Sequence, residues 1–392
     1  METIHVVGAG PAGLMAAQQF AQKGHPVIVY DHKPAAGRKF LVAGNGGFNL
    51  THSEDIELFL SRYDCQEMQT IVRKFTNQDT VKWLQSIGVP TYIGSSGKVF
   101  PQKGIKPIEV LQQWLSALEA LNVVFKFKHR LIDFDHSRII FKVNSAHEEI
   151  HYKRAVFAFG GKSWSKTGSD GSWIPLLESK HIQVTTVEPA NSGLTLASPL
   201  VRYAGVPLKN IRLFNSIGEK YGECVLTEYG LEGSAAYFMN RYIRKKDFPQ
   251  TLKLDLKPQF SYEHIASLLV EGKTSETMRK KLKLEPAKIS LLKTLPKETY
   301  VDPKKLAQAI KEYPLEITGF RPIDEVISTS GGVSWTELNA DLSLRKYPNI
   351  QCCGEMLDWD APTGGYLLQA CFASGYFVAN GAESYSERFH SS

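Results

Sequence analysis

Residues 8–13 (GAGPAG) are the first segment whose residue types and spacing could do chemistry. Gly8 allows a tight turn, Gly10 lets backbone amides approach a pyrophosphate, and Gly13 permits close packing of a helix on a strand. Pro11 suits the first turn of that helix, where its missing N–H is not needed. The phosphates would lie at the amino end of the helix, and Asp31, which ends the next expected strand, would accept a hydrogen bond from a ribose hydroxyl. The pattern predicts a bound dinucleotide.

Three further segments favour FAD as that dinucleotide. Residues 37–51 (GRKFLVAGNGGFNLT) could surround phosphate and ring with amides, Asn side chains and two cations. Residues 157–161 (FAFGG) form a strand that stops on glycines, where backbone passes close to a cofactor. Near the carboxyl end, Asp358 could bind the ribityl hydroxyls, and a helix beginning near Gly365 could direct its positive end at the flavin N1 and C2 carbonyl. Each segment alone could be a structural loop or helix, but together they predict one FAD site built from both ends of the chain.

Most residues expected to contact FAD lie in these four segments. They are Gly8, Gly10, Pro11, Ala12, Gly13, Asp31, His32, Lys33, Gly37, Arg38, Lys39, Asn45, Gly46, Asn49, Thr51, Leu131, Gly160, Gly161, Gly354, Glu355, Asp358, Gly364, Gly365, Tyr366, Leu367 and Leu368. No metal site is expected. The catalytic acid or base stays open, because the candidates His52, Tyr203, Glu228 and Tyr229 each suit a structural or surface role better.

The elements that must position these residues follow from hydrophobic periodicity. A strand, an amphipathic helix and a second strand open the chain, which is a βαβ unit. The middle of the chain looks inserted, and a strand, loop and helix of nucleotide-binding type close it. Expected strands cover 3–7, 26–30, a meander of five short runs within 122–158, most of 191–256, and 350–353; expected helices cover 11–23, parts of 54–75, 79–87, 107–121, parts of 261–313, and 366–380.

Four runs carry a resemblance to a known family. They are residues 36–52 (AGRKFLVAGNGGFNLTH), 166–173 (KTGSDGSW), 329–333 (TSGGV) and 354–375 (GEMLDWDAPTGGYLLQACFASG). Over nearly its whole length the chain resembles the bacterial NAD(P)/FAD-dependent oxidoreductases of the BaiN type, which are three-domain flavoproteins. The resemblance implies an α/β fold in which an FAD-binding, Rossmann-like domain of the glutathione-reductase type is split by a β-barrel-like segment and a helical insert.

The expected boundaries follow from that resemblance. The discontinuous FAD-binding domain takes residues 1–190 and 340–392, the β-rich inserted domain takes 191–257 and 315–339, and the basic helical insert takes 258–314. The chain departs from the family pattern at three places, and the first two of these departures place it in a side subgroup. They are Gly47-Phe48 in place of Arg-Cys, Tyr366-Leu367-Leu368-Gln369 in place of Tyr-Asn-Leu-Gln, and Thr227-Glu228-Tyr229-Gly230 in place of Thr-His-x-Gly.

Two kinds of redox machinery are not expected. No second GxGxxG follows a strand after Gly13, which disfavours a separate nicotinamide-binding domain. NAD(P)H would then dock transiently as electron donor, or the substrate itself would be the reductant. No cysteine precedes Tyr63, so the redox disulfide of disulfide reductases is missing. Cys352-Cys353 is expected to be a buried strand pair rather than a vicinal disulfide, because free Cys behaves as a small hydrophobe.

The charge of the chain is concentrated in one segment. The 392 residues hold 46 Lys+Arg and 40 Asp+Glu, a net charge of +6. Residues 273–305 hold ten basic and four acidic residues, and 10 − 4 = 6 accounts for the whole excess. A solvated helical surface is the simpler interpretation. An electrostatic footprint for RNA is the alternative, although aromatic side chains are absent from 273–299 and Arg occurs there once.

Three functional hypotheses follow, with FAD as cofactor in each. The first is an oxidoreductase that passes hydride through flavin N5 to or from a small molecule. The second is an enzyme that acts on RNA, in tRNA modification, through the basic insert. The third keeps FAD as a structural group. A cytoplasmic location is expected, because no run of about 18 apolar residues occurs, the amino terminus has no basic leader, and five irregularly spaced cysteines do not suggest disulfides. No membrane partner is expected, nucleic acid is the less favoured partner, and the oligomeric state stays open.

Overall fold

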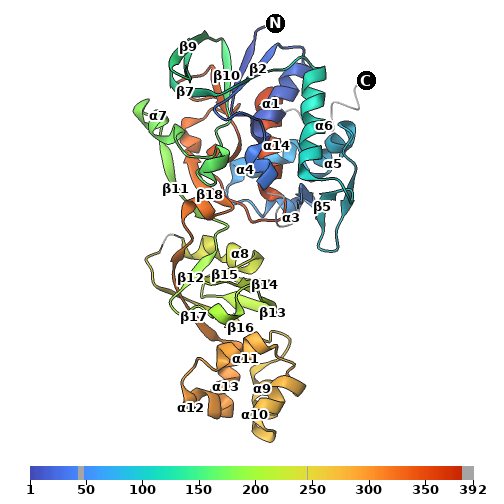
Figure 1. The fold of residues 1–392 in the computed structure, drawn as a ribbon, viewed down its shortest axis with the longest axis vertical. Helices are drawn as coiled ribbons and strands as arrows, with labels where there is room; N and C mark the ends of the chain where they lie inside the picture. The colour runs from blue at the N-terminus through green and yellow to red at the C-terminus, as the bar shows by residue number, and fades with distance from the viewer. Residues whose placement is uncertain (43–47, 245, 382–392) are drawn as a thin grey trace. The chain divides into compact units, whose positions relative to one another are not determined.

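The computed structural model describes residues 1–42, 48–244 and 246–381, and it divides the chain into two units (Figure 1). Unit 1 comprises Met1–Glu188 with Ile327–Ser392, and unit 2 comprises Pro189–Val326. Residues 315–339, expected to belong together in the inserted part, span both units. Their second half includes β18 (Ser328–Val333), which pairs with β11 (Val184–Ala190). The expected division into three domains stays a prediction.

A five-stranded parallel sheet forms the centre of unit 1, in the order β19-β10-β1-β2-β6. Most of its side chains are buried, as is typical of parallel strands that are covered on both faces. The strands are β1 (Ile4–Val7), β2 (Val27–Asp31), β6 (Val124–Phe127), β10 (Arg154–Phe157) and β19 (Ile350–Cys352). The expected opening βαβ unit and the expected carboxyl-terminal strand are confirmed.

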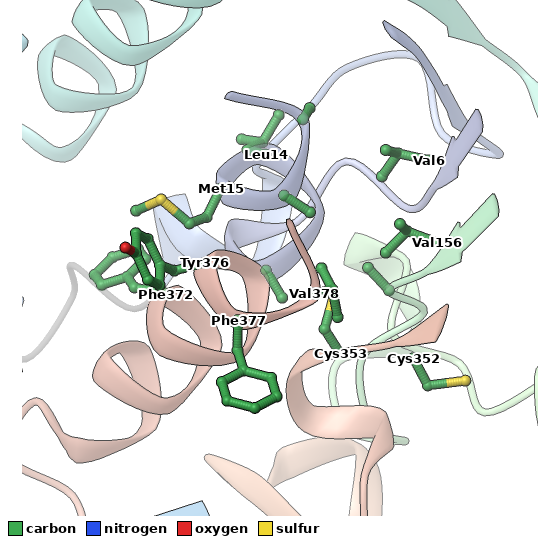
Figure 2. Packing of buried hydrophobic residues seen from close by; sticks show 14 of the residues in the cluster. Val6, Leu14, Met15, Val156, Cys352, Cys353, Phe372, Tyr376, Phe377 and Val378 are labelled. Carbon is green, nitrogen blue, oxygen red and sulfur yellow. The ribbon is translucent and has the colours of Figure 1, made fainter. Parts of the chain in front are cut away.

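Helices α1 (Pro11–Gln22) and α14 (Tyr366–Asn380) pack together in unit 1, and both are nearly as long as expected. A Cβ on Gly375 would lie 2.3 Å from the Ala12 carbonyl oxygen, so glycine permits the close crossing. Figure 2 shows Met15 of α1 and Phe372 of α14 on one side of the two helices, with Val6 of β1 and Val156 of β10 on the other side. Residues from the two ends of the chain therefore share one core.

One face of the parallel sheet is covered by three antiparallel strands. They are β7 (His129–Phe134), β8 (Arg138–Val143) and β9 (Ala146–His151). Tyr30 of β2 stacks on Phe141 of β8 with ring centroids 4.5 Å apart. All five strands expected within 122–158 are present. The expectation that they form one meander is wrong, because β6 and β10, the first and last, join the parallel sheet instead. Sequence spacing alone does not distinguish the two pairings.

The other elements of unit 1 are short, apart from the 14-residue helix α6 (Pro107–Ala120). They are α2 (Arg38–Val42), β3 (Thr51–His52), α3 (Ile56–Leu60), α4 (Gln66–Lys74), α5 (Asn77–Ser86), β4 (Thr91–Ile93), β5 (Lys98–Pro101), α6, α7 (Trp173–Ser179) and several single 3₁₀ turns. The indole N–H groups of Trp83 and Trp114 both donate to Gln18 Oε1, which ties α5 and α6 to α1.

Unit 2 contains a closed barrel with the strand order β12-β15-β14-β13-β16-β17. The barrel implied by the family resemblance is therefore present. One helix within it, α8 (Ser234–Ile243), lies in a stretch expected to be mostly strands. Its buried residues Ala235, Ala236, Met239 and Ile243 recur at helical spacing. The strands are β12 (Leu194–Leu196), β13 (Pro207–Phe214), β14 (Glu219–Leu226), β15 (Gly230–Glu232), β16 (Gln250–Asp255) and β17 (Tyr313–Phe320).

Between β16 and β17 the chain forms a group of short helices, as expected for residues 261–313 (Figure 1). Pro286 and Pro303 lie in the first turns of their helices, where a proline removes no hydrogen bond. The helices are α9 (Tyr262–Glu271), α10 (Thr274–Glu276), the π-type turn η4 (Thr277–Lys281), α11 (Pro286–Leu292), α12 (Lys297–Val301) and α13 (Pro303–Lys311). Among the described residues of the whole chain, no helix is both long and apolar enough to cross a membrane.

Candidate functional site: a cleft at the carboxyl edge of the parallel sheet

A cleft in unit 1 lies where β1, β2, β10 and β19 end, with an empty volume of about 1030 Å³ that includes its open mouth. Residues immediately after each of these strands line it: Gly8, His32, Ala158 and Cys353. Strand β1 has β2 on one side and β10 on the other, so the chain order reverses beside β1. Such a reversal opens a crevice outside the carboxyl ends of the strands, which is the usual ligand site of open α/β sheets.

A side chain would meet different surroundings at each of the three glycines of residues 8–13. Gly8 has a φ of +112°, and a Cβ there would lie 2.2 Å from the Ala158 carbonyl oxygen. A Cβ on Gly13 would lie 1.9 Å from the Gly8 carbonyl oxygen. At Gly10 no atom of residues 1–42, 48–244 or 246–381 lies within 4 Å of a Cβ, and Gly10 lines the cleft. The fold requires Gly8 and Gly13, whereas only an occupant of the cleft would require Gly10.

The amino end of α1 opens into the same cleft. Its cap residue Gly10 supplies no side-chain hydrogen bond, and Pro11 occupies the first turn. The first backbone N–H groups of a helix have no partner within the helix, and together with the helix dipole they favour an anion. Pro11 and Ala12 line the cleft beside them.

Asp31 is held at the edge of the cleft by two backbone amides. Its Oδ2 accepts from the Ala9 N–H and its Oδ1 from the Lys33 N–H, both at 2.8 Å. His32 Nδ1 lies 3.8 Å from Asp31 Oδ1, and His32 Nε2 lies 3.9 Å from Asp170 Oδ2. Burial lowers the pKa of His32 although the neighbouring Asp31 opposes that change, so the ring is neutral near pH 7. This corner of the cleft offers carboxylate and imidazole acceptors to hydroxyl groups.

Four buried polar atoms in the cleft lining have no hydrogen-bond partner among the described residues. They are His32 Nε2, Arg38 Nε, Ser169 Oγ and Trp173 Nε1. A buried polar atom left unpaired costs about 1–3 kcal/mol. Four of them around one cleft fit a polar occupant that supplies the missing partners.

A half-buried ion pair fixes Glu355 in the cleft. Lys39 Nζ lies 2.7 Å from Glu355 Oε2 and donates to Ser163 Oγ at 2.8 Å. The Thr329 N–H donates to Glu355 Oε1 at 3.1 Å. Asp358, expected to meet the ribityl chain, does not line the cleft, and its carboxylate accepts from Thr185 Oγ1 at 2.7 Å. Glu355 is the carboxylate at the end of β19 that faces the cleft.

The turn before α14 is braced by residues expected to contact the cofactor. Gly365 has a φ of +104°, and a Cβ there would lie 2.5 Å from Thr51 Cα. Thr51 Oγ1 donates to Gln369 Oε1 at 2.8 Å. The Tyr366 hydroxyl donates to Glu54 Oε1 at 2.6 Å, and burial raises the pKa of Tyr366 above its usual value. Thr51 and Tyr366 therefore position the amino end of α14.

About half of the expected cofactor residues come together in the cleft. Its lining includes Gly8, Gly10, Pro11, Ala12, Asp31, His32, Gly37, Arg38, Lys39, Leu131, Gly160, Gly354 and Glu355. Those described but outside the lining are Gly13, Lys33, Asn49, Thr51, Gly161, Asp358, Gly364, Gly365, Tyr366, Leu367 and Leu368. Asn45 and Gly46 lie outside the described residues.

Sequence reasoning missed one wall of the cleft. This wall comes from the run 166–173, which carried only a family resemblance, and Gly168 in it has a φ of +124°. Arg130 Nη2 lies 3.2 Å from Asp170 Oδ2, which fixes the run to β7. Two glycines flanking a Ser-Asp pair were the available signal. The lining residues from this run are Thr167, Gly168, Ser169, Asp170, Ser172 and Trp173.

The structure also places the adjacent cysteines and the four weighed acid/base candidates. Cys352 and Cys353 are free and buried as expected, although β19 ends at Cys352 and Cys353 follows it. None of His52, Tyr203, Glu228 and Tyr229 lines the cleft. The described residues hold no group of three or more His, Cys, Asp and Glu side chains that could bind a metal ion.

Comparison with known proteins identifies the family. The family model described as HI0933-like protein Rossmann domain matches residues 2–381. The chain belongs to this HI0933-like family. A 3-dehydro-bile acid delta(4,6)-reductase of Clostridium scindens is 24% identical over 97% of this chain and 99% of that protein. A ribosomal RNA dihydrouridine synthase of Escherichia coli is 22% identical over 95% of this chain and 96% of that protein.

Solved structures agree with this assignment at the level of the fold. An open conformation of a flavocytochrome c3 fumarate reductase aligns with a TM-score of 0.53 at 16% identity, covering 97% of this chain and 78% of that chain. The expected family and the expected fold class are confirmed. The oxidoreductase class expected from the sequence agrees with the HI0933-like family and with both named relatives.

Proposed function

We propose that the chain is an FAD-dependent oxidoreductase that holds FAD in the unit 1 cleft and acts on a small-molecule substrate. One observation carries the proposal: at the point where the strand order reverses, Gly10 faces open space beside an uncapped helix end. A pyrophosphate is the group that needs both the space and the free amides. The four unpaired polar atoms of the lining support a large polar occupant.

The residues of the cleft divide naturally among the parts of the cofactor. The amino end of α1 would hold the pyrophosphate, and Asp31 would accept from the adenosine ribose. Glu355 would take the ribityl role first expected of Asp358, because Glu355 lines the cleft and Asp358 does not. The turn at Gly364 and Gly365 would direct the amino end of α14 at the ring. Bound FAD supplies hydride transfer at N5.

The chain's own residues then have defined roles. Lys39 neutralises Glu355 and, together with Ser163 and Thr329, holds its carboxylate in place. Helix α14 contributes a fixed positive end that would stabilise negative charge on a reduced ring. We propose NAD(P)H as a transient donor, because the sequence offers no second dinucleotide turn. A cytoplasmic location also stays a prediction.

The first test is whether the purified protein carries FAD. We expect yellow protein that releases one FAD per chain on denaturation, and a flavin band that NADH or NADPH bleaches under anaerobic conditions. Protein that stays colourless after incubation with FAD would overturn the proposal. Bound flavin that neither nicotinamide reduces would favour the alternative in which FAD is structural.

A second candidate function is reduction of a base in RNA. Two observations favour it: two relatives are named ribosomal RNA dihydrouridine synthase, and the helical insert of unit 2 exposes many cations. Incubation of the reduced protein with ribosomal RNA that lacks dihydrouridine, followed by nucleoside mass spectrometry, tests it directly. A parallel screen of small unsaturated ketones tests the small-molecule alternative, for which the bile acid reductase is the relevant relative.

A further inference from the structure

We propose that the exposed cations of residues 273–305 form a docking surface for RNA, which we call the basic surface. The choice of RNA among polyanions rests on the second candidate function, whereas the surface itself rests on charge, exposure and packing. Its members all have exposed side chains: Lys273, Arg279, Lys280, Lys281, Lys283, Lys293, Lys297, Lys304 and Lys305.

Lys288, the tenth cation of residues 273–305, has a structural role in this segment. Lys288 is 2% exposed, and its Nζ donates to the carbonyl oxygens of Lys209 at 2.6 Å and Leu256 at 3.1 Å. Burial lowers the pKa of Lys288, although nearby Glu285 opposes that change. No comparable contact is found for the nine exposed cations within the described part of the chain, so packing does not account for them.

The acidic residues of the segment leave most of this charge uncompensated. Glu276 pairs with Lys280 at 2.8 Å, and Glu285 pairs with the buried Lys288 at 3.1 Å. Asp302 caps α13 by accepting from the Lys304 and Lys305 backbone N–H groups. Of the nine exposed cations, Lys280 alone has an acidic side chain within 4 Å in the described structure.

Unit 1 also exposes cations that have no acidic side chain within 4 Å in the described structure, among them Lys103, Lys142 and Lys153, but other cations there are paired. Arg73 pairs with Glu57, and Arg138 pairs with both Asp135 and Glu149. A merely solvated helical surface would be expected to alternate charges in the same way. Removing the ten basic and four acidic residues of 273–305 from the totals of 46 and 40 leaves 36 of each, so the net positive charge is a property of this surface rather than of the chain as a whole.

Packing brings the basic segments onto one body. Helix α9 packs against α13 and η4, and α12 packs against α13. Arg279 of η4 lies close enough to Tyr300 of α12 to act on its pKa, which burial raises and Arg279 lowers. In η4, three consecutive cations, Arg279, Lys280 and Lys281, are exposed. The half-buried Tyr300 ring adds an aromatic group beside these charges, just beyond the aromatic-free stretch.

An anionic membrane fits this surface less well than RNA. Membrane-surface helices bury an apolar face in the lipid. In the helical insert the apolar side chains, among them Leu282, Leu292 and Leu306, are buried, and its exposed large apolar residues within the described structure are Val270 and Val301. Lysines without an apolar face match the phosphate backbone of a nucleic acid, to which they bind as point charges.

The test is fluorescence anisotropy of a labelled RNA hairpin titrated with the full-length protein over a range of salt concentrations. We expect the logarithm of the association constant to fall linearly with the logarithm of the salt concentration. The triple variant Arg279→Gln/Lys281→Gln/Lys283→Gln should lower the salt slope by about 2 to 3, at roughly 0.7–0.9 per lost phosphate contact. At low salt its affinity should fall at least about tenfold.

The matched control removes the same charge elsewhere. Lys103, Lys142 and Lys153 are exposed lysines of unit 1, and their triple Gln variant should bind within about twofold of the unmodified protein. Circular dichroism and thermal melting check that both variants are folded. A second basic-surface variant, Lys297→Gln/Lys304→Gln/Lys305→Gln, should weaken binding independently.

Four results would overturn the proposal: no binding, salt-independent binding, equal losses in the control variant, or tighter binding to phosphatidylserine vesicles or duplex DNA than to RNA. The assay does not require flavin. Protein that binds RNA but forms no dihydrouridine would support the docking surface and count against the second candidate function. Protein that binds RNA and stays colourless would separate the surface from the proposed oxidoreductase activity altogether.

Discussion

Replacing Gly10 by valine should remove FAD binding and leave the fold intact. The backbone at Gly10 has φ −85° and ψ 179°, an extended conformation that a β-branched residue adopts freely. A Cβ there would meet no atom of the described residues within 4 Å. The new side chain would occupy only the space over the amino end of α1. In the same turn, Gly13→Ala provides the opposite case, because its Cβ would lie 1.9 Å from the Gly8 carbonyl oxygen.

The magnitudes separate the two variants. Valine in place of glycine at a helix cap costs about 1 kcal/mol, largely offset by the about 0.4–1 kcal/mol gained from a stiffer unfolded chain. The melting temperature of the FAD-free Gly10→Val protein should therefore change by less than about 3 °C. Pushing a pyrophosphate away from two helix amides loses two hydrogen bonds to a charged group, about 1.5–3 kcal/mol each. The FAD dissociation constant should rise at least about a hundredfold.

Gly13→Ala should show the reverse pattern. Its Cβ forces backbone apart where α1 crosses β1, and such overpacking costs about 1–3 kcal/mol or more. The FAD-free protein should then melt several degrees lower. Flavin fluorescence titration and differential scanning calorimetry of both FAD-free variants measure the two effects. FAD affinity within about threefold of normal in Gly10→Val would refute the placement of the pyrophosphate over this turn.

Three other outcomes follow from the described contacts. Burial alone would raise the pKa of Glu54, but hydrogen bonds from Arg62 and Tyr366 lower that pKa below 4.5. The ionised Glu54 carboxylate therefore stabilises the fold fully above pH 4.5, and this stabilisation is lost as pH falls through the pKa of Glu54 in the folded protein. The difference in melting temperature between the unmodified protein and Glu54→Gln should shrink between about pH 5 and about pH 3. Lys288→Met should lower the unfolding free energy by about 1–3 kcal/mol, because two carbonyl oxygens lose their hydrogen-bond donor. Lys293→Met, at an exposed lysine, is the control. Equal losses of unfolding free energy for the two variants in urea melts would contradict this prediction. Burial raises the pKa of every cysteine thiol, so Ellman's reagent near pH 8 should find no fast-reacting thiol in folded protein and five in denaturant; one fast thiol would contradict it. The thiols are Cys65, Cys224, Cys352, Cys353 and Cys371.

The parts of the fold that sequence predicts well are those whose cause is local. Residues 8–13 prescribe a turn by glycine geometry, and the structure gives a separate steric reason for Gly8 and for Gly13. The helix 366–380 has the expected bounds because its start is marked by two glycines with positive φ, Gly364 and Gly365. In these segments local preference and tertiary packing agree, so one sequence window contains the answer.

The parts that sequence predicts badly depend on partners distant in the chain. Whether β6 belongs to a meander or to the parallel sheet is decided by pairing with β2, about 95 residues earlier. Helix α8 is short and lies between strands, so its helical spacing competes with a strand interpretation. The choice between Glu355 and Asp358 is decided by contacts from Lys39 and Thr329 on one side and Thr185 on the other. Such choices need three-dimensional neighbours.

The paired strands β11 and β18 explain how one sheet can be built from both ends of the chain around a long insertion. Bringing together the ends of roughly 140 flexible residues costs about 4 kcal/mol of chain entropy. These two strands meet where that closure occurs: a Cβ on Gly331 would lie 2.2 Å from the Thr186 carbonyl oxygen. Once they pair, the closure cost depends only weakly on the length of the insertion, because it grows with the logarithm of that length. The barrel and its helices can therefore change in sequence and charge without altering the register of β19 on β10. Differences in partner among members of the HI0933-like family are for that reason expected in the inserted unit, and the cofactor cleft is expected to stay the same.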